Sequence, residues 1–250
     1  MKKTSCLNGN QSRACQYSKE AKASFRNDRK RFVLTLVLRE IYNSQFKNTL
    51  VFKGGTALHK LYLHKRLSVD LDFTALDEFD IDIFKNVLLI KEINSQIRKI
   101  RAFENSVSID LKYISLLNYP DSIKIDVSFR EKPLLELKEV PVDSPYFPDF
   151  LVLTFQIEEI ASEKMRALIQ RKRPRDYLDM WLLMKELKFK DFEKLAKKKL
   201  AAMNDDFDIG KIFTDLDIVK SLWKVDLEQL VPELPDFDAV MNYLKDKLEL

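Results

Sequence analysis

Two aspartates separated by one residue, Asp70 and Asp72, carry the chemistry that this chain suggests most directly. They lie in residues 66–73, RLSVDLDF, where polar and apolar residues alternate. Alternation predicts a β-strand that places Arg66, Ser68, Asp70 and Asp72 on one face and the apolar side chains on the other. Two carboxylates at this spacing lie about 7 Å apart and repel each other unless a cation binds between them. A divalent ion, Mg²⁺ or Mn²⁺, is the natural candidate.

A glycine-rich turn, Gly54-Gly55-Thr56, precedes these acids. The chain has only four glycines, and two of them stand together here, after the apolar TLVFK and before ALHKLYLHK, which is typical of a helix. Glycine permits positive φ and close approach of the backbone, and a helix N-terminus offers amides to an anion. Fourteen residues separate Gly55 from Asp70, which is enough for a helix and a return strand. A phosphate-binding turn beside a metal site is therefore predicted.

A third carboxylate is expected, because two-metal phosphoryl transfer needs ligands for an ion beside the attacking hydroxyl. Asp126, in KIDVSF, lies between two apolar residues of a predicted strand that could pair beside the first two acids. Asp110, in SIDLKY, has a similar setting and competes with it. We favour Asp126, because its separation from the first pair leaves room for an intervening helix and hairpin.

A lysine and two aspartates are predicted to be buried in the C-terminal half. Lys164 falls in the middle of the apolar stripe of its helix. Either its stem covers apolar surface while the ammonium reaches solvent, or the stripe faces a cleft and Lys164 reaches a triphosphate. Asp176 and Asp179 lie one turn apart on a helix that is otherwise apolar nearly all round. Buried carboxylates need partners, which Lys164, Arg175 or a metal could supply.

The charge is unevenly distributed. Residues 201–250 carry twelve Asp and Glu against five Lys and Arg, so the net charge of +4 divides into −7 there and +11 over residues 1–200. A basic excess favours a polyanion such as RNA, although solvated lysine-rich helix faces explain it equally well. The densest basic run consists of Arg171, Lys172, Arg173 and Arg175. A helix dipole accounts for one or two of these charges, and RNA contact is predicted for the rest.

Other features exclude whole classes of protein. Cys6 and Cys15 are the only cysteines, which rules out a disulfide framework and a cysteine-based zinc site. His59 and His64 are five residues apart, do not stack on one helix face, and are interpreted as packing or surface residues. No apolar run approaches a membrane span, and no apolar segment follows the first lysines. We expect a cytoplasmic protein without a membrane segment.

The chain is predicted to consist of a mobile leader over residues 1–17, an α/β lobe over 18–150 and a helical lobe over 151–250. In the α/β lobe we expect helices near 18–44 and 80–103 and a mixed sheet of four or five strands, including a hairpin around Tyr119. Pro141, Pro145 and Pro148 indicate a connector. Helices are predicted over residues 154–171, 174–187, 191–203 and 236–249.

At the level of motifs, FKGGTALHK, RLSVDLDF and IDV together resemble the nucleotidyltransferase pattern of a glycine turn, a paired-acid strand and a third acid strand. The Gly-Gly-Thr turn with Arg-x-Ser-x-Asp-x-Asp resembles more specifically the AbiEii/AbiGii toxins of bacterial abortive-infection and toxin–antitoxin systems, within the DNA polymerase beta-like superfamily. EKMRALIQRKRPRDYLDMWLL is similar to a later motif of that family. The resemblance spans roughly residues 30–190.

The resemblance implies an α+β nucleotidyltransferase fold followed by a helical bundle, and transfer of a nucleoside monophosphate from a nucleoside triphosphate. Asp70, Asp72 and Asp126 would hold Mg²⁺, and Asp126 would help to deprotonate the acceptor. Lys164 would stabilise the triphosphate and Asp179 would position Lys164 or the acceptor. The nucleotide-binding residues would be Gly54, Gly55, Thr56, Arg66, Ser68 and Lys164.

The resemblance also implies a toxin that blocks growth, a role in phage defence, a cognate antitoxin, and an RNA acceptor such as the 3′ end of tRNA. Two alternatives stay open. The acceptor could be a protein or a small molecule, which would need no basic surface. A non-catalytic module that senses a nucleotide is the other alternative, and metal-dependent turnover would exclude it.

Overall fold

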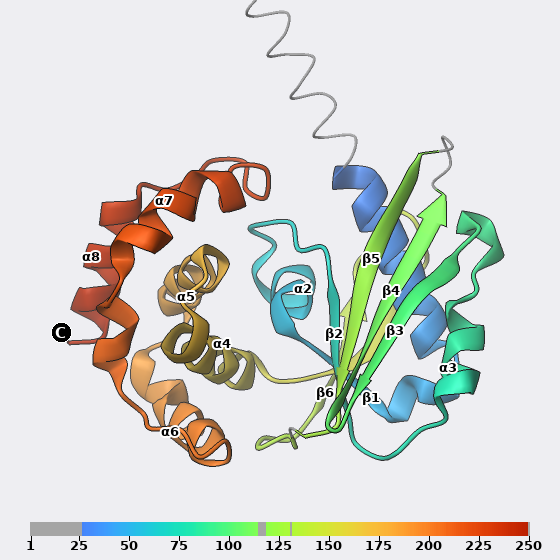
Figure 1. Ribbon diagram of the computed structural model, residues 1–250, viewed down its shortest axis with the longest axis horizontal. Coiled ribbons are helices and arrows are strands. Elements are labelled where there is room, and N and C mark those ends of the chain that lie inside the picture. Colours follow the sequence, from blue (N-terminus) through green and yellow to red (C-terminus); the bar gives the residue numbers. More distant parts are fainter. Residues whose placement is uncertain (1–26, 115–118, 131, 250) are drawn as a thin grey trace, which may run out of the picture.

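The structure is a computed structural model that describes residues 27–114, 119–130 and 132–249, so the expected leader over residues 1–17 lies outside the described part. A mixed seven-stranded sheet runs in the order β3-β4-β5-β2-β1-β7-β6 (Figure 1). Its strands are β1 (Leu50–Lys53), β2 (Leu71–Ala75), β3 (Gln96–Phe103), β4 (Ser106–Ile114), β5 (Pro120–Ser128), β6 (Lys138–Val142) and β7 (Phe150–Thr154). The predicted α+β class and the β4-β5 hairpin are confirmed.

The prediction of four or five strands was wrong, because three strands of the sheet were missed. Residues 80–103 were expected to be helical, but α3 (Ile81–Leu88) ends early, and Asn94 in the left-handed region precedes β3. The side chain of Asp80 caps the N-terminus of α3 by accepting hydrogen bonds from the backbone amides of Asp82 and Ile83. β3 is an edge strand that is largely exposed, so its apolar alternation is weak. Pairing with β4, rather than local pattern, determines its conformation.

The proline-rich stretch was expected to be a connector, and part of it forms β6. Pro141 lies in this edge strand, where a missing N–H costs no bond within the sheet. β7 then returns beside β1 in a parallel orientation. The division of the chain at residue 150 stays a prediction, and β7 runs across that point.

The strand expected over residues 66–73 is shorter than predicted, because β2 begins only at Leu71. Its antiparallel partner β1 ends at Lys53, opposite Asp72, where the chain turns into α2 (Gly54–Ala57) and η2 (Leu58–Leu63). Upstream of this point β2 has no β1 backbone to pair with, and Leu67 instead donates its amide to the carbonyl of Leu230. Arg66, Ser68 and Asp70 therefore do not share a strand face with Asp72.

The two faces of the sheet have different character near β2 and β5. Leu71 and Phe73 on β2, like Ile125 on β5, are fully buried in the core. Asp72 and Asp126 point to the other face, as strand alternation requires. Figure 1 shows α3 and the helix over residues 27–42 away from the helical bundle, while α2 lies on the bundle's side.

The C-terminal bundle is arranged around α5, which packs against α4, α7 and α8. Its helices are α4 (Ile157–Arg171), α5 (Pro174–Glu186), α6 (Phe189–Ala201), α7 (Leu216–Leu227) and α8 (Phe237–Lys247). Four of these confirm the predicted helices, and α7 was not predicted. In the described residues no helix has the length and apolar character needed to cross a membrane.

Candidate active site

Five polar side chains form a row across five neighbouring strands. Lys53 on β1 is opposite Asp72 on β2, which is in register with Asp126 on β5. Asp126 is in turn opposite Ser108 on β4, which is opposite Arg101 on β3. Residues paired in this way share a face of the sheet. The row therefore brings two of the predicted acids side by side at the strand spacing, about 4.8 Å between backbones.

Asp126, rather than Asp110, is the acid beside Asp72. Asp110 lies on the same face but one strand further away, opposite Lys124. It also forms an ion pair with Arg101 at 3.0 Å. This placement supports our choice of Asp126, whose catalytic role stays a prediction.

The negative charges of Asp70, Asp72 and Asp126 repel one another. Burial, together with the negative charge of Asp126, raises the pKa of Asp72 to about 6. Burial also raises the pKa of Asp70, which lies just before β2, although the charge of Arg175 opposes the shift. Lys124 neutralises part of this charge through an ion pair with Asp126 at 2.7 Å. A cation bound between Asp72 and Asp126 would relieve the remaining repulsion.

The donor set fits a magnesium ion that shares its coordination with a substrate. Within residues 27–114, 119–130 and 132–249, no group of three or more His, Cys, Asp or Glu side chains is arranged to hold a metal ion. Mg²⁺ is usually held by one or two carboxylates, with phosphate oxygens and water completing its shell, rather than by a protein cage. Asp72 and Asp126 supply those two carboxylates, and Asp70 is near enough to act on both electrostatically.

The glycine turn lies directly against the acids. Gly54 has φ +74°, and a Cβ added to it would lie 2.2 Å from Oδ2 of Asp72, so only glycine fits here. A Cβ on Gly55 would lie 3.0 Å from Nη2 of Arg66 and 3.7 Å from Nζ of Lys164. Ser68 Oγ would be 3.2 Å away. The turn thus collects most of the predicted nucleotide-binding residues, which come from both halves of the chain.

Thr56 has a structural contact that was not anticipated. Its buried hydroxyl donates a hydrogen bond to the backbone carbonyl of Asp70. The bond ties α2 to the segment that precedes β2 and so positions Asp70. Its predicted contact with phosphate stays a prediction.

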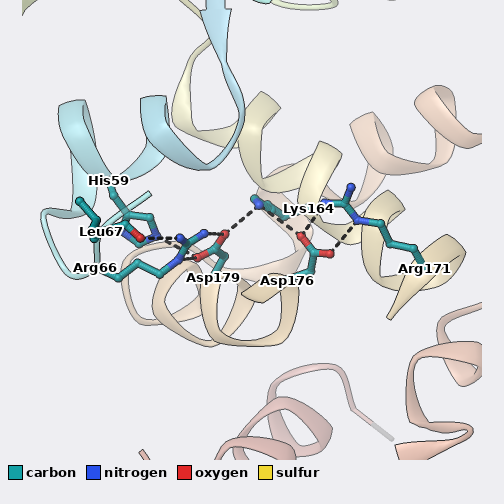
Figure 2. A network of polar contacts seen from close by, with 7 residues as sticks. All are labelled: His59, Arg66, Leu67, Lys164, Arg171, Asp176 and Asp179. Carbon is teal, nitrogen blue, oxygen red and sulfur yellow. Dashed lines mark hydrogen bonds and ion pairs between the residues drawn. The ribbon is translucent and has the colours of Figure 1, made fainter. Parts of the chain in front are cut away.

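A buried ionic network joins η2 and the segment before β2 to the helical bundle (Figure 2). Arg66 donates Nε and Nη2 to the two carboxylate oxygens of Asp179 on α5, at 2.6 and 2.7 Å. Lys164 on α4 lies 2.7 Å from Oδ2 of Asp179, and His59 Nε2 lies 2.8 Å from Oδ1. Lys164 is thus confirmed as a partner of the buried carboxylates. Arg66, predicted to lie on the strand, lies before β2 and is buried in this network, and its predicted contact with the nucleotide stays a prediction.

The network continues from Lys164 to Asp176, 3.2 Å away. Arg171 binds the other side of Asp176 through Nε at 2.8 Å and Nη2 at 3.0 Å (Figure 2). Lys172 forms an ion pair with Asp215 at 3.0 Å. Two members of the basic run are therefore engaged within the protein, while Arg175 acts on Asp70 through its charge. The predicted RNA contacts of Arg171, Lys172, Arg173 and Arg175 stay predictions.

The charges of this network fix its protonation. Burial alone would raise the pKa of Asp179, but Arg66 and Lys164 hold it well below its usual value. Burial would lower the pKa of Lys164, and the two aspartates raise it instead. Burial lowers the pKa of His59, so a neutral ring donates Nε2–H to Asp179. Sequence reasoning missed His59, because its partner is 120 residues away and no local pattern signals it.

Two cavities adjoin these residues. One of about 400 Å³ is lined by the polar row and extends along β3 and β4 to Phe103. The other, of about 390 Å³, is lined by Thr56, Arg66 and Ser68 together with Lys60 and Tyr146. The first cavity contains Asp72 and Asp126, so the reacting groups of a substrate would lie there.

A mixed sheet with paired acids beside a glycine turn, followed by a helical bundle, defines a nucleotidyltransferase. The chain belongs to the family described as nucleotidyl transferase AbiEii toxin, type IV toxin–antitoxin system, which matches residues 36–243. It is 30% identical over 217 residues to an uncharacterized protein of Aquifex aeolicus, a match that covers 85% of this chain and 92% of that protein.

Two solved structures have a fold similar to that of this chain. JHP933 from Helicobacter pylori has a TM-score of 0.60 at 21% identity, over 86% of this chain and 88% of that one. MenT4, a nucleotidyltransferase toxin of Mycobacterium tuberculosis, has a TM-score of 0.56 at 18% identity, over 86% and 80% of the two chains.

Proposed function

We propose that this nucleotidyltransferase acts as a growth-inhibiting toxin that transfers a nucleoside monophosphate to the 3′-terminal hydroxyl of an RNA, with tRNA as the acceptor. The observation that carries the transfer chemistry is the register of Asp72 with Asp126 immediately beside Gly54. The family supports the toxin role. The basic excess over residues 1–200 supports a polyanionic acceptor.

In this proposal the glycine turn and the sheet acids divide the work. Gly54 and Gly55 let the backbone approach the triphosphate, and Lys164, which lies beside Gly55, stabilises its charge. Asp72 and Asp126, with Asp70 beside them, would hold Mg²⁺ or Mn²⁺, and the ion would polarise the phosphates and lower the pKa of a bound hydroxyl. Asp126 accepts the proton of the acceptor hydroxyl. The acceptor oxygen bonds to the α-phosphorus as the bond to pyrophosphate breaks.

The buried network serves this site indirectly. Asp179 holds Lys164 and Arg66 in place against Gly55.

A protein that works as a toxin also needs restraint in its own cell, and we propose a cognate antitoxin in the same cytoplasm.

The experiment is nucleotide transfer with purified protein, Mg²⁺ and each α-labelled nucleoside triphosphate in turn, added to total cellular RNA and protein extract. We expect label in a tRNA-sized band, lost with Asp72→Ala and with a chelator. Label confined to protein or to small molecules would overturn the RNA acceptor. No label in any fraction would favour a nucleotide-sensing module.

A further inference from the structure

The sheet face beyond Asp126 is open and carries an exposed aromatic ring. Phe103, the last residue of β3, is 61% exposed and lies at the rim of the cavity that contains Asp72 and Asp126. Its register partner on β4 is Ser106, which lies opposite Ser128 on β5. Phe103 lies two residues beyond Arg101 of the polar row and therefore on the same face as the acids.

The order of elements places this face on the acceptor side of the site. The glycine turn follows β1, Asp72 is on β2 beside it, and Asp126 is on β5, one strand further. β4 and β3 come next, on the side of Asp126 away from the turn. With a triphosphate at the turn, an acceptor that reaches Asp126 from the opposite side would pass over β4 and β3, which together span about 10 Å at the strand spacing.

The side chains along that path suit a single-stranded polyanion with planar bases. Lys124 and Arg101 border the cavity. Lys99 on β3 and Lys112 on β4 lie on the same face, on the side of the polar row away from Phe103. Single-stranded nucleic acid is bound by this combination of basic groove and aromatic platform.

Two observations point to a ligand rather than to a bare surface. Ser108 is 6% exposed, lines the cavity between Arg101 and Asp126, and has a hydroxyl without a hydrogen-bond partner among the described residues. An exposed phenylalanine on an edge strand also invites unwanted pairing, whereas basic residues there discourage it. Among the exposed large apolar side chains of the described residues, Phe103 is the one that lines this cavity.

We propose that β3 and β4 form the binding surface for the single-stranded 3′ end of the acceptor RNA. Phe103 stacks on a base near the terminus, and Arg101 contacts a backbone phosphate. Ser108 donates to the terminal nucleotide. The inference rests on the proposed function, since it names the surface that would hold the RNA acceptor of the same reaction.

The test measures RNA binding apart from catalysis, by anisotropy of a short 5′-labelled single-stranded RNA on the full chain. Replacing an aromatic platform costs about 1–3 kcal/mol per stacked base. Phe103→Leu is therefore expected to raise Kd and KM for the RNA roughly tenfold, at the lower part of that range, with kcat and triphosphate binding unchanged. Phe103→Trp is expected to bind as tightly as the unaltered protein.

A second RNA, with an abasic site near its 3′ end, isolates the stacking. The unaltered protein and Phe103→Leu should bind it equally weakly, because no base is left to stack. Leu151→Ala is the matched control, since Leu151 is 55% exposed on β7 near the other edge of the same sheet. It is expected to bind both RNAs normally.

The outcomes separate this inference from the proposed function. If RNA is bound and labelled normally by Phe103→Leu and by Arg101→Gln, the β3–β4 surface is not the acceptor site, although the RNA activity stands. If the unaltered protein transfers nucleotide but binds no RNA, the RNA acceptor and this surface both fail.

Discussion

Asp72 and Asp126 are register partners on the parallel strands β2 and β5, and the glycine turn touches the first of them. Two acids that are about 50 residues apart in the sequence thus become neighbours in the sheet. Their mutual repulsion raises the pKa of Asp72, in addition to the larger effect of burial. The ionised carboxylate of Asp72 therefore lowers the stability of the fold at neutral pH in the absence of a bound cation.

Replacing Asp72 should separate activity from stability. Its folded-state pKa of about 6 lies above the ordinary 3.8, so the ionised carboxylate destabilises the fold at pH 7. Asp72→Asn is expected to lower nucleotide transfer at least about a hundredfold while raising Tm, as activity assays and thermal unfolding would show. The control is Asp110→Asn, because Asp110 lies on the same face of the sheet as Asp72 and Asp126. This variant is expected to have an unchanged kcat at saturating acceptor. A drop in Tm for Asp72→Asn would contradict the electrostatic account.

Gly54 should be intolerant of any side chain. In Gly54→Ala the methyl group would meet Asp72 at 2.2 Å on a backbone with φ +74°, which costs about 1–3 kcal/mol of stability. Because Asp72 must move, transfer activity should also fall. Chemical denaturation would measure the first effect, with Gly210→Ala as the control at a position without positive φ. Equal stability of Gly54→Ala and Gly210→Ala would refute this geometry.

Asp179 should be the most costly residue of the buried network to replace. Asp179→Asn leaves Arg66 and Lys164 without their shared counter-charge, and breaking a buried pair costs about 3–5 kcal/mol. Urea unfolding would show this loss, whereas Asp238→Asn, at an exposed pair with Lys220, should have little effect.

The pH dependence of stability gives a second readout for Asp179. Its folded-state pKa lies well below the ordinary 3.8, so its contribution is present above 3.8 and is lost as the pH falls through the folded value. As the pH falls below 3.8, the unaltered protein should therefore lose more stability than Asp179→Asn. Parallel curves for the two proteins would show that the ion pairs contribute nothing at low pH.

RNA binding should depend strongly on salt. Each phosphate neutralised by Lys or Arg on a single strand adds about −0.7 to the slope of log K against log salt concentration. Arg101→Gln is expected to make the slope for RNA binding shallower by the contribution of roughly one such contact. The slope for triphosphate binding should not change. A salt-independent RNA affinity would contradict a basic acceptor surface.

Local patterns predicted some parts of this site and could not predict others. Asp72 and Asp126 each lie in a period-two alternation within their own strand, so the sequence predicted that each side chain points away from the apolar face. Arg66 and Ser68 continue the same alternation, but β1 ends at Lys53 and leaves that part of the chain without a strand partner. His59 was missed because only tertiary contact brings it to Asp179.

The edge strand β3 was not predicted, for a related reason. β3 is exposed on both sides of its chain, so it lacks the apolar alternation that identifies a half-buried strand. Phe103 at its end has no sequence context that distinguishes it from a core phenylalanine, and only the fold reveals its exposure.

The central claim is that Asp72 and Asp126 direct attack on the α-phosphorus of a nucleoside triphosphate. The most direct measurement compares α-labelled and γ-labelled triphosphate with the same RNA and quantifies released pyrophosphate, for the unaltered protein, Asp72→Asn and Asp126→Asn. The account predicts α-label on the RNA, γ-label only in pyrophosphate, equal amounts of the two products, and loss of both in each variant. Transfer of γ-label to the acceptor, or undiminished transfer by either variant, would contradict it.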